Sequence, residues 1–238
     1  MSAETHNALL VIADIGGYTR FMNLHRLSLA HAQENTLRLL DAVIDAAPDL
    51  ELSALEGDAA FMYVTDPDAA QVTSSLAGLA QAMHAAFHVE QGKMDTLTVC
   101  PCDACHQIGN LSVKAVAHYG EIAITQRRGS KTLAGVDVIL VHRMLKNSVP
   151  VDEYMLMTEP VRALAGPPFA ELGTPIDEEL EGLGTQRLYY VDLADVAGPS
   201  EATETGGWFQ RTTYNGAMTA RALPYLVGLK RSAVEVAD

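Results

Sequence analysis

The sequence predicts an α/β sandwich whose sheet is mixed or antiparallel, and three observations carry this prediction. Apolar runs that end in glycine or acidic turns alternate with segments whose apolar residues recur at helical spacing. Strands and helices alternate in pairs, which fits such a sheet better than a doubly wound parallel one. With 238 residues and 48% apolar content, the chain is long enough to bury a sizeable core.

Composition also limits the function. The formal charge of −14, from 30 acids against 16 bases, argues against nonspecific nucleic-acid binding, which needs a basic face. No apolar run approaches the roughly 20 residues that span a bilayer, and no signal peptide pattern is evident. We therefore expect a soluble, cytoplasmic protein that binds neither membranes nor nucleic acid, and whose three cysteines stay reduced.

The first strand ends in a turn that suits an anion. The apolar run 9–13 stops at Asp14 and then Ile15, Gly16 and Gly17, where glycine lets the backbone approach a ligand closely. A helix is expected to begin next, because apolar residues resume at helical spacing. The outward-pointing amides at its start would belong to Gly17, Tyr18 and Thr19.

A second acid follows a glycine at the mouth of another apolar strand, at Gly57 and Asp58. If the two strands are neighbours, Asp14 and Asp58 together would bind a divalent metal for a nucleotide phosphate chain. The alternative is that each aspartate only caps a helix or turn, as aspartate often does.

The remaining elements follow from periodicity and turn residues. A helix at 27–47 ends at Pro48, a hairpin through Gly57 joins strands at 50–55 and 59–65, and a helix spans 69–88. A turn is expected at 91–93, followed by two strands at 111–118 and 121–125 that meet at Tyr119 and Gly120. The later elements are a helix at 134–147, a strand at 154–158, a helix at 160–165 and a hairpin at 180–193.

Four ligand-type residues form a compact cluster with the pattern C-x-C-x-x-C-H, and they are Cys100, Cys102, Cys105 and His106. They could hold a structural Zn²⁺. A single metal there could be closed by His106, or by His84 or His88 from the preceding helix. The alternatives are a redox-reactive loop or plain reduced thiols.

A basic loop stands out in this acidic chain, with Arg127, Arg128 and Lys131 around a glycine. It could contact phosphate, or it could be an ordinary solvated turn. His118 lies on an expected core strand, where a hydrogen-bonded buried histidine is a better interpretation than a metal ligand.

The chain divides into a domain at 1–196, with a cysteine-containing insertion at 89–110, and a C-terminal segment at 197–238. The C-terminal segment begins with a Gly, Pro, Ser, Thr and Glu-rich linker to about residue 207. The apolar stretch 208–229, which holds the single tryptophan, is expected to dock on its own domain or on a second subunit.

Between about residues 8 and 193, the chain resembles the catalytic domain of the class III nucleotidyl cyclases, the adenylate and guanylate cyclase family. Residues 10–19 resemble the family's opening strand and metal turn, and Gly57 with Asp58 resembles its second metal motif. Residues 116–120 resemble its central strand, and 135–143 its helix that ends in a catalytic arginine. The four motifs occur in the family's order.

This resemblance implies a ferredoxin-like, mostly antiparallel sheet-and-helix sandwich that works as a homodimer and holds a nucleoside triphosphate between subunits. It implies that Asp14, Asp58 and the carbonyl of Ile15 bind Mg²⁺ or Mn²⁺. The ions would activate the ribose 3′-hydroxyl to attack the α-phosphorus and expel pyrophosphate. Arg143 would stabilise the charge that develops on the α-phosphate.

The chain departs from the family at its other substrate contacts. Where the family has a base-reading lysine and aspartate, this chain has Ala54 and Thr132. Where it has a ribose-orienting asparagine and a phosphate-binding lysine, this chain has Ile139 and Leu183. The pattern fits another base, such as a pyrimidine, or no base. Residues that could substitute are Arg127, Arg128, Lys131 and Arg187.

Two functions follow. The first is a metal-dependent cyclase with altered base preference, which the intact metal turn favours. The second is a cyclase-fold module that binds nucleotide or mediates dimerisation without turnover, which the missing ribose and phosphate contacts favour.

Overall fold

The computed structural model describes residues 4–24, 29–97, 107–127 and 130–196. Its strands are β1 (Glu4–Gly16), β2 (Glu51–Glu56), β3 (Ala59–Thr65), β4 (Ser112–Arg127), β5 (Ser130–Ala134), β6 (Tyr154–Thr158), β7 (Thr174–Leu180) and β8 (Gly184–Asp192). The helices before β4 are α1 (Tyr18–Leu24), α2 (Leu29–Asp45), α3 (Asp68–Ser74), α4 (Leu76–Leu97) and the short 3₁₀-helix η2 (Ile108–Asn110). Those after it are α6 (Val136–Arg143), α7 (Glu159–Leu164), α8 (Phe169–Leu172) and α9 (Leu193–Val196).

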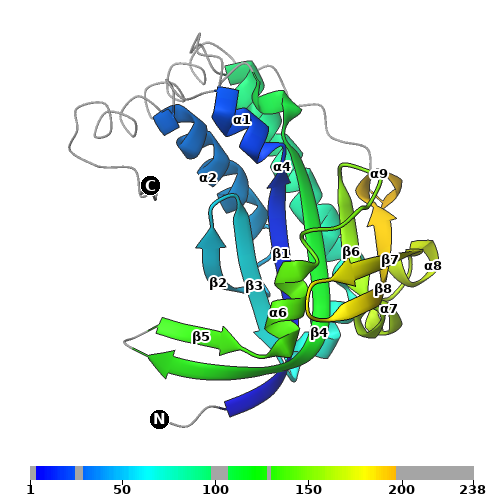
Figure 1. The fold of residues 1–238 in the computed structure, drawn as a ribbon. Helices are drawn as coiled ribbons and strands as arrows, with labels where there is room; N and C mark the ends of the chain where they lie inside the picture. Colours follow the sequence, from blue (N-terminus) through cyan, green and yellow to red (C-terminus); the bar gives the residue numbers. More distant parts are fainter. Residues whose placement is uncertain (1–3, 25–28, 98–106, 128–129, 197–238) are drawn as a thin grey trace.

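The described strands form one sheet in the order β2-β3-β1-β4-β6-β8-β7, and β5 pairs with β4 (Figure 1). The β4–β6 pairing is parallel, and the other pairings are antiparallel. The predicted α/β sandwich with a mostly antiparallel sheet is confirmed.

Alternation along β1 builds a core on each face of the sheet. Leu9 and Val11 pack in the cluster that holds the apolar faces of α2 and α4. Leu10 and Ile12 pack in the other cluster, with Val141 of α6. Figure 1 shows α2 and α4 behind the sheet, α1 beyond the end of β1, and α6 in front of the sheet. Residues 8–13 of β1 are buried on both faces of the sheet, and they form a continuous apolar run.

The helix predicted at 69–88 is two helices, and the turn predicted at 91–93 is wrong. The helical path breaks at Ser75, and α4 then runs without interruption to Leu97. The buried side chain of Gln91 donates hydrogen bonds to the carbonyls of Ile108 (2.9 Å) and Leu111 (2.7 Å). These tertiary contacts outweigh the low helix propensity of Gly92.

The two strands predicted at 111–118 and 121–125 are one strand, β4, so the turn predicted at Tyr119 and Gly120 is wrong. β1 pairs with β4 from Ser112 to Ile124, which keeps the strand extended through Gly120. Glycine is needed there because a Cβ would lie only 2.3 Å from Asp137 Oδ2.

The helix predicted at 134–147 is shorter, since α6 ends at Arg143. The side-chain oxygen of Asn147 accepts hydrogen bonds from Val149 N (3.1 Å) and the Tyr154 hydroxyl (3.0 Å). This local turn satisfies backbone groups that a longer helix would have used. The hairpin predicted at 180–193 is present, but its first strand, β7, begins earlier, at Thr174.

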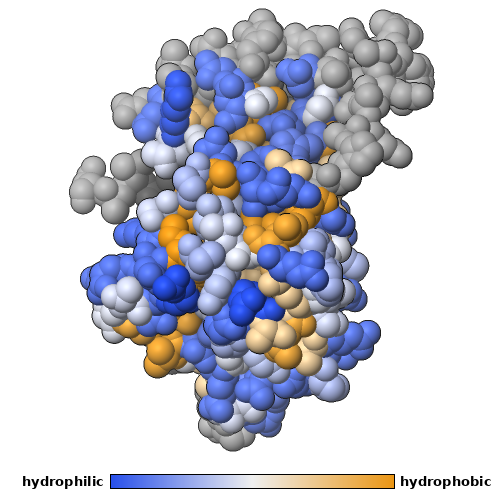
Figure 2. Space-filling model, turned by 90° about the vertical axis from the view of Figure 1, so that its right-hand side faces the viewer, coloured by the Kyte–Doolittle hydropathy of each residue, from blue (hydrophilic) through white to orange (hydrophobic). Residues whose placement is uncertain are grey.

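The predicted cysteine cluster, linker and C-terminal docking segment lie outside the described residues. Among those described, no helix combines the length and apolar character needed to cross a bilayer. On the side that carries α7, α8 and the β7–β8 hairpin, apolar areas are interspersed with polar ones (Figure 2).

Candidate metal and nucleotide site

The structure brings the two predicted acids together. In the register of β1 against β3, Asp14 lies opposite Ala59, the residue that follows Asp58. The Ile15 amide donates a hydrogen bond to the Asp58 carbonyl (3.1 Å). Burial, followed by the negative charge of Asp14, raises the pKa of Asp58 to about 6. Asp14 and Asp58 therefore interact directly at the end of β1.

A lysine that was not predicted from the sequence completes this cluster. Lys114 of β4 is the cross-strand partner of Asp14, and its Nζ lies 3.1 Å from Asp14 Oδ2. Burial opposes the charge on Lys114, but Asp14, Tyr154 and Asp58 together more than offset it, so the pKa of Lys114 is raised. The available signal was a lysine flanked by apolar residues in the run 113–117.

The glycine turn is explained in part by packing. Gly17 has φ +81°, and a Cβ on it would lie 3.3 Å from the Asn110 carbonyl oxygen. A Cβ on Gly16 would lie 2.2 Å from Ser112 Oγ, so any other residue there would require the Ser112 side chain to turn away. Burial, and then the negative charge of Asp58, raise the pKa of the next residue, Tyr18.

A pocket of about 290 Å³ lies beside this turn. Its lining residues are Gly17, Arg20, Phe21, Gln107, Asn110 and Leu111. The volume is near the lower end of the range for small-ligand pockets. Arg20 was not predicted as a site residue, and its guanidinium is the group best suited to bind phosphate oxygens.

The predicted catalytic arginine is held in an ion pair. Arg143 ends α6, and its Nη1 lies 3.0 Å from Glu181 Oε2 in the β7–β8 turn, without the alignment of a hydrogen bond. The preceding residue, His142, lies 3.4 Å from Glu56 Oε1. This end of α6 therefore packs close to the strand that leads to Asp58.

Two other basic residues predicted to contact phosphate, Lys131 and Arg187, are also held in ion pairs with carboxylates. Lys131 Nζ lies 2.8 Å from the carboxylate of Glu51, and Arg187 Nε lies 2.8 Å from Asp177 Oδ1. The side chains of Arg127 and Arg128 lie outside what the structure describes.

His118 is a buried structural histidine, as predicted. Its Nδ1 hydrogen-bonds with the Thr158 hydroxyl at 2.9 Å, and its Nε2 lies 3.1 Å from Asp137 Oδ1. Burial is the main effect on its pKa, which is lowered.

Comparison with known proteins places the chain in a family. Residues 36–154 match the family described as "Protein of unknown function (DUF2652)". The chain is also 38% identical over 195 residues to "Uncharacterized protein Rv2561/Rv2562" of Mycobacterium tuberculosis strain ATCC 25618 / H37Rv. That match covers 82% of this chain and 90% of the relative. The chain belongs to the DUF2652 family.

Solved structures establish the fold of this DUF2652 chain. The adenylyl cyclase CyaB of P. aeruginosa is 14% identical with a TM-score of 0.59, over 85% of this chain and 100% of that one. The guanylyl cyclase Cya2 is 14% identical with a TM-score of 0.59, over 80% of this chain and 94% of that one. A class III adenylyl cyclase-like ATP-binding protein from Pseudomonas aeruginosa is 15% identical with a TM-score of 0.55, over 69% of this chain and 36% of that one. The fold is that of class III cyclase catalytic domains.

A separate cluster of metal-ligating side chains was only partly foreseen in the DUF2652 sequence. His84 and His88, considered from the sequence only as partners of the cysteines, lie against Glu153. Burial opposes the charge of Glu153, but hydrogen bonds from both histidines and from Val113 N lower its pKa to about 2. Two histidines four residues apart on a helix were the available signal.

Proposed function

We propose that this chain is a divergent class III nucleotidyl cyclase-like protein that binds a divalent metal–nucleoside triphosphate complex. The observation that carries this proposal is the direct interaction of Asp14 and Asp58 at the end of β1. The fold supports a homodimer and the formation of a 3′,5′-cyclic nucleotide with release of pyrophosphate as its activity.

The residues fit a hard divalent cation. Burial, and then repulsion from the adjacent carboxylate of Asp14, raise the pKa of Asp58, and a cation relieves that repulsion. Carboxylate and carbonyl oxygens are the ligands that Mg²⁺ and Mn²⁺ prefer, and Asp14, Asp58 and the Ile15 carbonyl would supply them. When bound, the ion would neutralise the phosphate chain and lower the pKa of the ribose 3′-hydroxyl.

Other residues would bind and orient the nucleotide. Arg20, in the pocket beside Gly17, is suited to hold the triphosphate in place of the lysine that Leu183 replaces. Arg143 would have to leave Glu181 before it could stabilise charge on the α-phosphate. That exchange is feasible because Glu181 is highly exposed, and exposed ion pairs contribute little free energy.

A second function, nucleotide binding without turnover, is favoured by a specific observation. Ile139 stands where cyclases orient the ribose, and its side chain is 49% exposed on α6. Losing one transition-state contact costs roughly 100-fold to 1,000-fold in rate, so several losses would abolish turnover while metal-dependent binding remained.

Titration calorimetry of the full chain with each of the four ribonucleoside triphosphates and Mn²⁺ tests the binding proposal. We expect binding of at least one triphosphate to require Mn²⁺ and to be lost in Asp14→Asn and Asp58→Asn. The exposed Asp45→Asn is the matched control and should bind normally. Equal binding in all three variants would contradict the proposal.

Mass spectrometry of the same mixtures separates the two functions. A cyclic product that disappears in Asp14→Asn supports the cyclase. Metal-dependent binding without product supports the binding module.

A further inference from the structure

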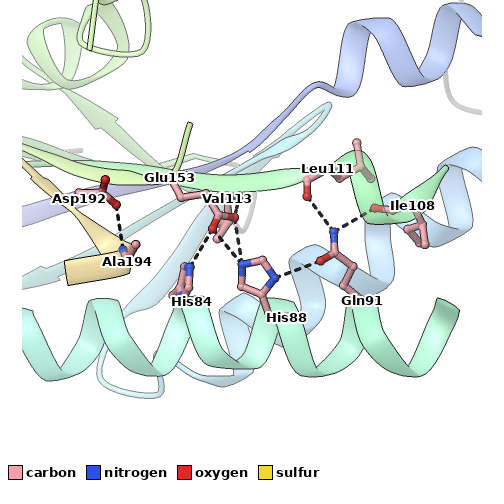
Figure 3. Close-up of polar contacts among 9 residues, drawn as sticks. All are labelled: His84, His88, Gln91, Ile108, Leu111, Val113, Glu153, Asp192 and Ala194. Carbon is pink, nitrogen blue, oxygen red and sulfur yellow. Dashed lines mark hydrogen bonds and ion pairs between the residues drawn. The ribbon is translucent and has the colours of Figure 1, made fainter. Parts of the chain in front are cut away.

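His84, His88 and Glu153 form a cluster that the nucleotide site does not use (Figure 3). His84 and His88 lie one turn apart on α4 and point toward Glu153, the residue before β6. His84 Nε2 lies 2.9 Å from Glu153 Oε2, and His88 Nε2 lies 3.0 Å from both carboxylate oxygens. One ligand atom from each residue lies within 4.8 Å of the others.

The outer contacts of the cluster fix His88. The Gln91 amide nitrogen donates to the Ile108 and Leu111 carbonyls, which leaves its oxygen to accept from His88 Nδ1 at 3.0 Å (Figure 3). His88 therefore carries a proton on Nδ1, and its Nε2 faces the carboxylate. Metal-binding histidines are usually oriented by such an outer hydrogen bond.

Glu153 is also oriented by a backbone group. The Val113 amide donates to Glu153 Oε1 at 3.1 Å, so the carboxylate is tied to β4. The side chains of His84, His88 and Glu153 are 12%, 30% and 23% exposed, which lets an ion enter from solvent and retain a water ligand.

We propose that His84 Nε2, His88 Nε2 and the Glu153 carboxylate bind one divalent transition metal ion, with Zn²⁺ as the best match. Two imidazole nitrogens and one carboxylate are a common ligand set for Zn²⁺, with water as the fourth ligand. Imidazole nitrogen does not suit Mg²⁺, so the ion differs in class from the one expected at Asp14 and Asp58. The bound ion would clamp α4 to β4 and to the start of β6.

The site is separate from the nucleotide site, although the same strands serve both. Successive residues of a strand point to opposite faces of the sheet. Asp14 shares a face of β1 with Leu10 and Ile12, whereas α4, which carries His84 and His88, packs on the opposite face. Removing the acids of one site should therefore leave the ligands of the other in place.

The test measures the affinity of the full chain for Zn²⁺, with no other ligand present, by competition with a chromophoric chelator. The chain carries Cys100→Ser, Cys102→Ser and Cys105→Ser so that thiols do not bind the ion. We expect one Zn²⁺ per chain. His84→Gln and His88→Gln should each weaken binding by more than about 100-fold, which exceeds the cost of losing an outer partner. His6→Gln, on β1, is the matched control and should bind normally.

The variant Glu153→Gln should stay folded, because its amide oxygen still accepts the hydrogen bond from Val113. It therefore separates a loss of Zn²⁺ binding from a loss of folding. It should keep the circular dichroism of the parent and lose the Zn²⁺-induced rise in melting temperature. Asp14→Asn with Asp58→Asn should retain Zn²⁺, which separates this proposal from the proposed function.

Two results would overturn the proposal. One is unchanged Zn²⁺ affinity in the folded His84 and His88 variants. The other is the complete loss of Zn²⁺ binding when only the cysteines are replaced.

Discussion

Lys114 and a divalent ion would compete for the same carboxylate oxygens of Asp14. Without metal, the ammonium of Lys114 offsets part of the charge of Asp14 at 3.1 Å, and Asp58 retains its proton up to about pH 6. With metal, both carboxylates would be ionised and Lys114 would be displaced. The protonation of Asp58 and the position of Lys114 therefore report whether metal is bound.

Replacing Lys114 with Met should increase the affinity for Mn²⁺ and lower the stability of the metal-free chain. The substitution removes the cation that competes with Mn²⁺. In the metal-free chain, no ammonium would then offset the charge of Asp14 beside Asp58. Thermal unfolding with and without Mn²⁺ would show a lower melting temperature without metal and a larger rise on adding it. An unchanged rise would mean that Lys114 does not occupy the metal position.

The affinity for Mn²⁺ should also decrease as the pH is lowered, with a midpoint near pH 6. The pKa of Asp58 is raised from 3.8 to about 6, so the folded metal-free chain holds this proton when the unfolded chain has released it. The Asp58 contribution to stability is thus present at low pH and is lost as pH rises through about 6. At pH 5, a bound proton should weaken Mn²⁺ binding roughly tenfold relative to pH 7.5.

Calorimetry across this range would measure proton release as Mn²⁺ binds. The variant Asp58→Asn should show no pH dependence with this midpoint. A wild-type affinity that stays constant from pH 5 to 7.5 would contradict the assignment of Asp58 as a ligand.

At the scale of elements, short apolar runs predicted β3, β6 and the central part of β1, and the turn at Gly57 predicted β2. It failed at α4, where Gln91 is held by carbonyls about 20 residues away. It also failed at Gly120, which looks like a turn but lies in β4, where its missing Cβ makes room for Asp137. Local sequence patterns do not contain such long-range contacts.

Gln91→Met should therefore destabilise the chain by about 1–3 kcal/mol, because buried carbonyls each lose a hydrogen bond. The side chains have similar length, but methionine cannot donate to the carbonyls of Ile108 and Leu111. Chemical denaturation would measure the loss. Asp95→Ala, at an exposed position on the same helix, should change stability by less than about 0.5 kcal/mol. Equal effects would show that the Gln91 contacts do not stabilise α4.

At the scale of the whole molecule, the sequence predicted that Asp14 and Asp58 would meet. Asp14 follows one apolar run, and Asp58 directly precedes another. The contact with Lys114 could not be predicted, since it depends on the register between β1 and β4, about 100 residues apart. Glu153 was missed for the same reason, because its partners come from α4.

The cyclase-like fold also leads us to expect a homodimer, and α6 offers a surface for it. Val136 and Ile139 are 64% and 49% exposed and lie three residues apart on one face of the helix. Ile139→Glu with Val136→Glu should convert the dimer to a monomer in light scattering. Leu172→Glu, at a 45% exposed position on α8, is the matched control and should remain dimeric. A wild-type monomer would contradict the expectation.

A crystal of the full chain with Mn²⁺ and a non-hydrolysable nucleoside triphosphate would test the metal and nucleotide site most directly. Anomalous scattering should place Mn²⁺ in contact with the carboxylates of both Asp14 and Asp58, with the Lys114 ammonium moved away from Asp14. A map without that peak, in which Lys114 keeps its ion pair with Asp14 at saturating Mn²⁺ and nucleotide, would contradict the account.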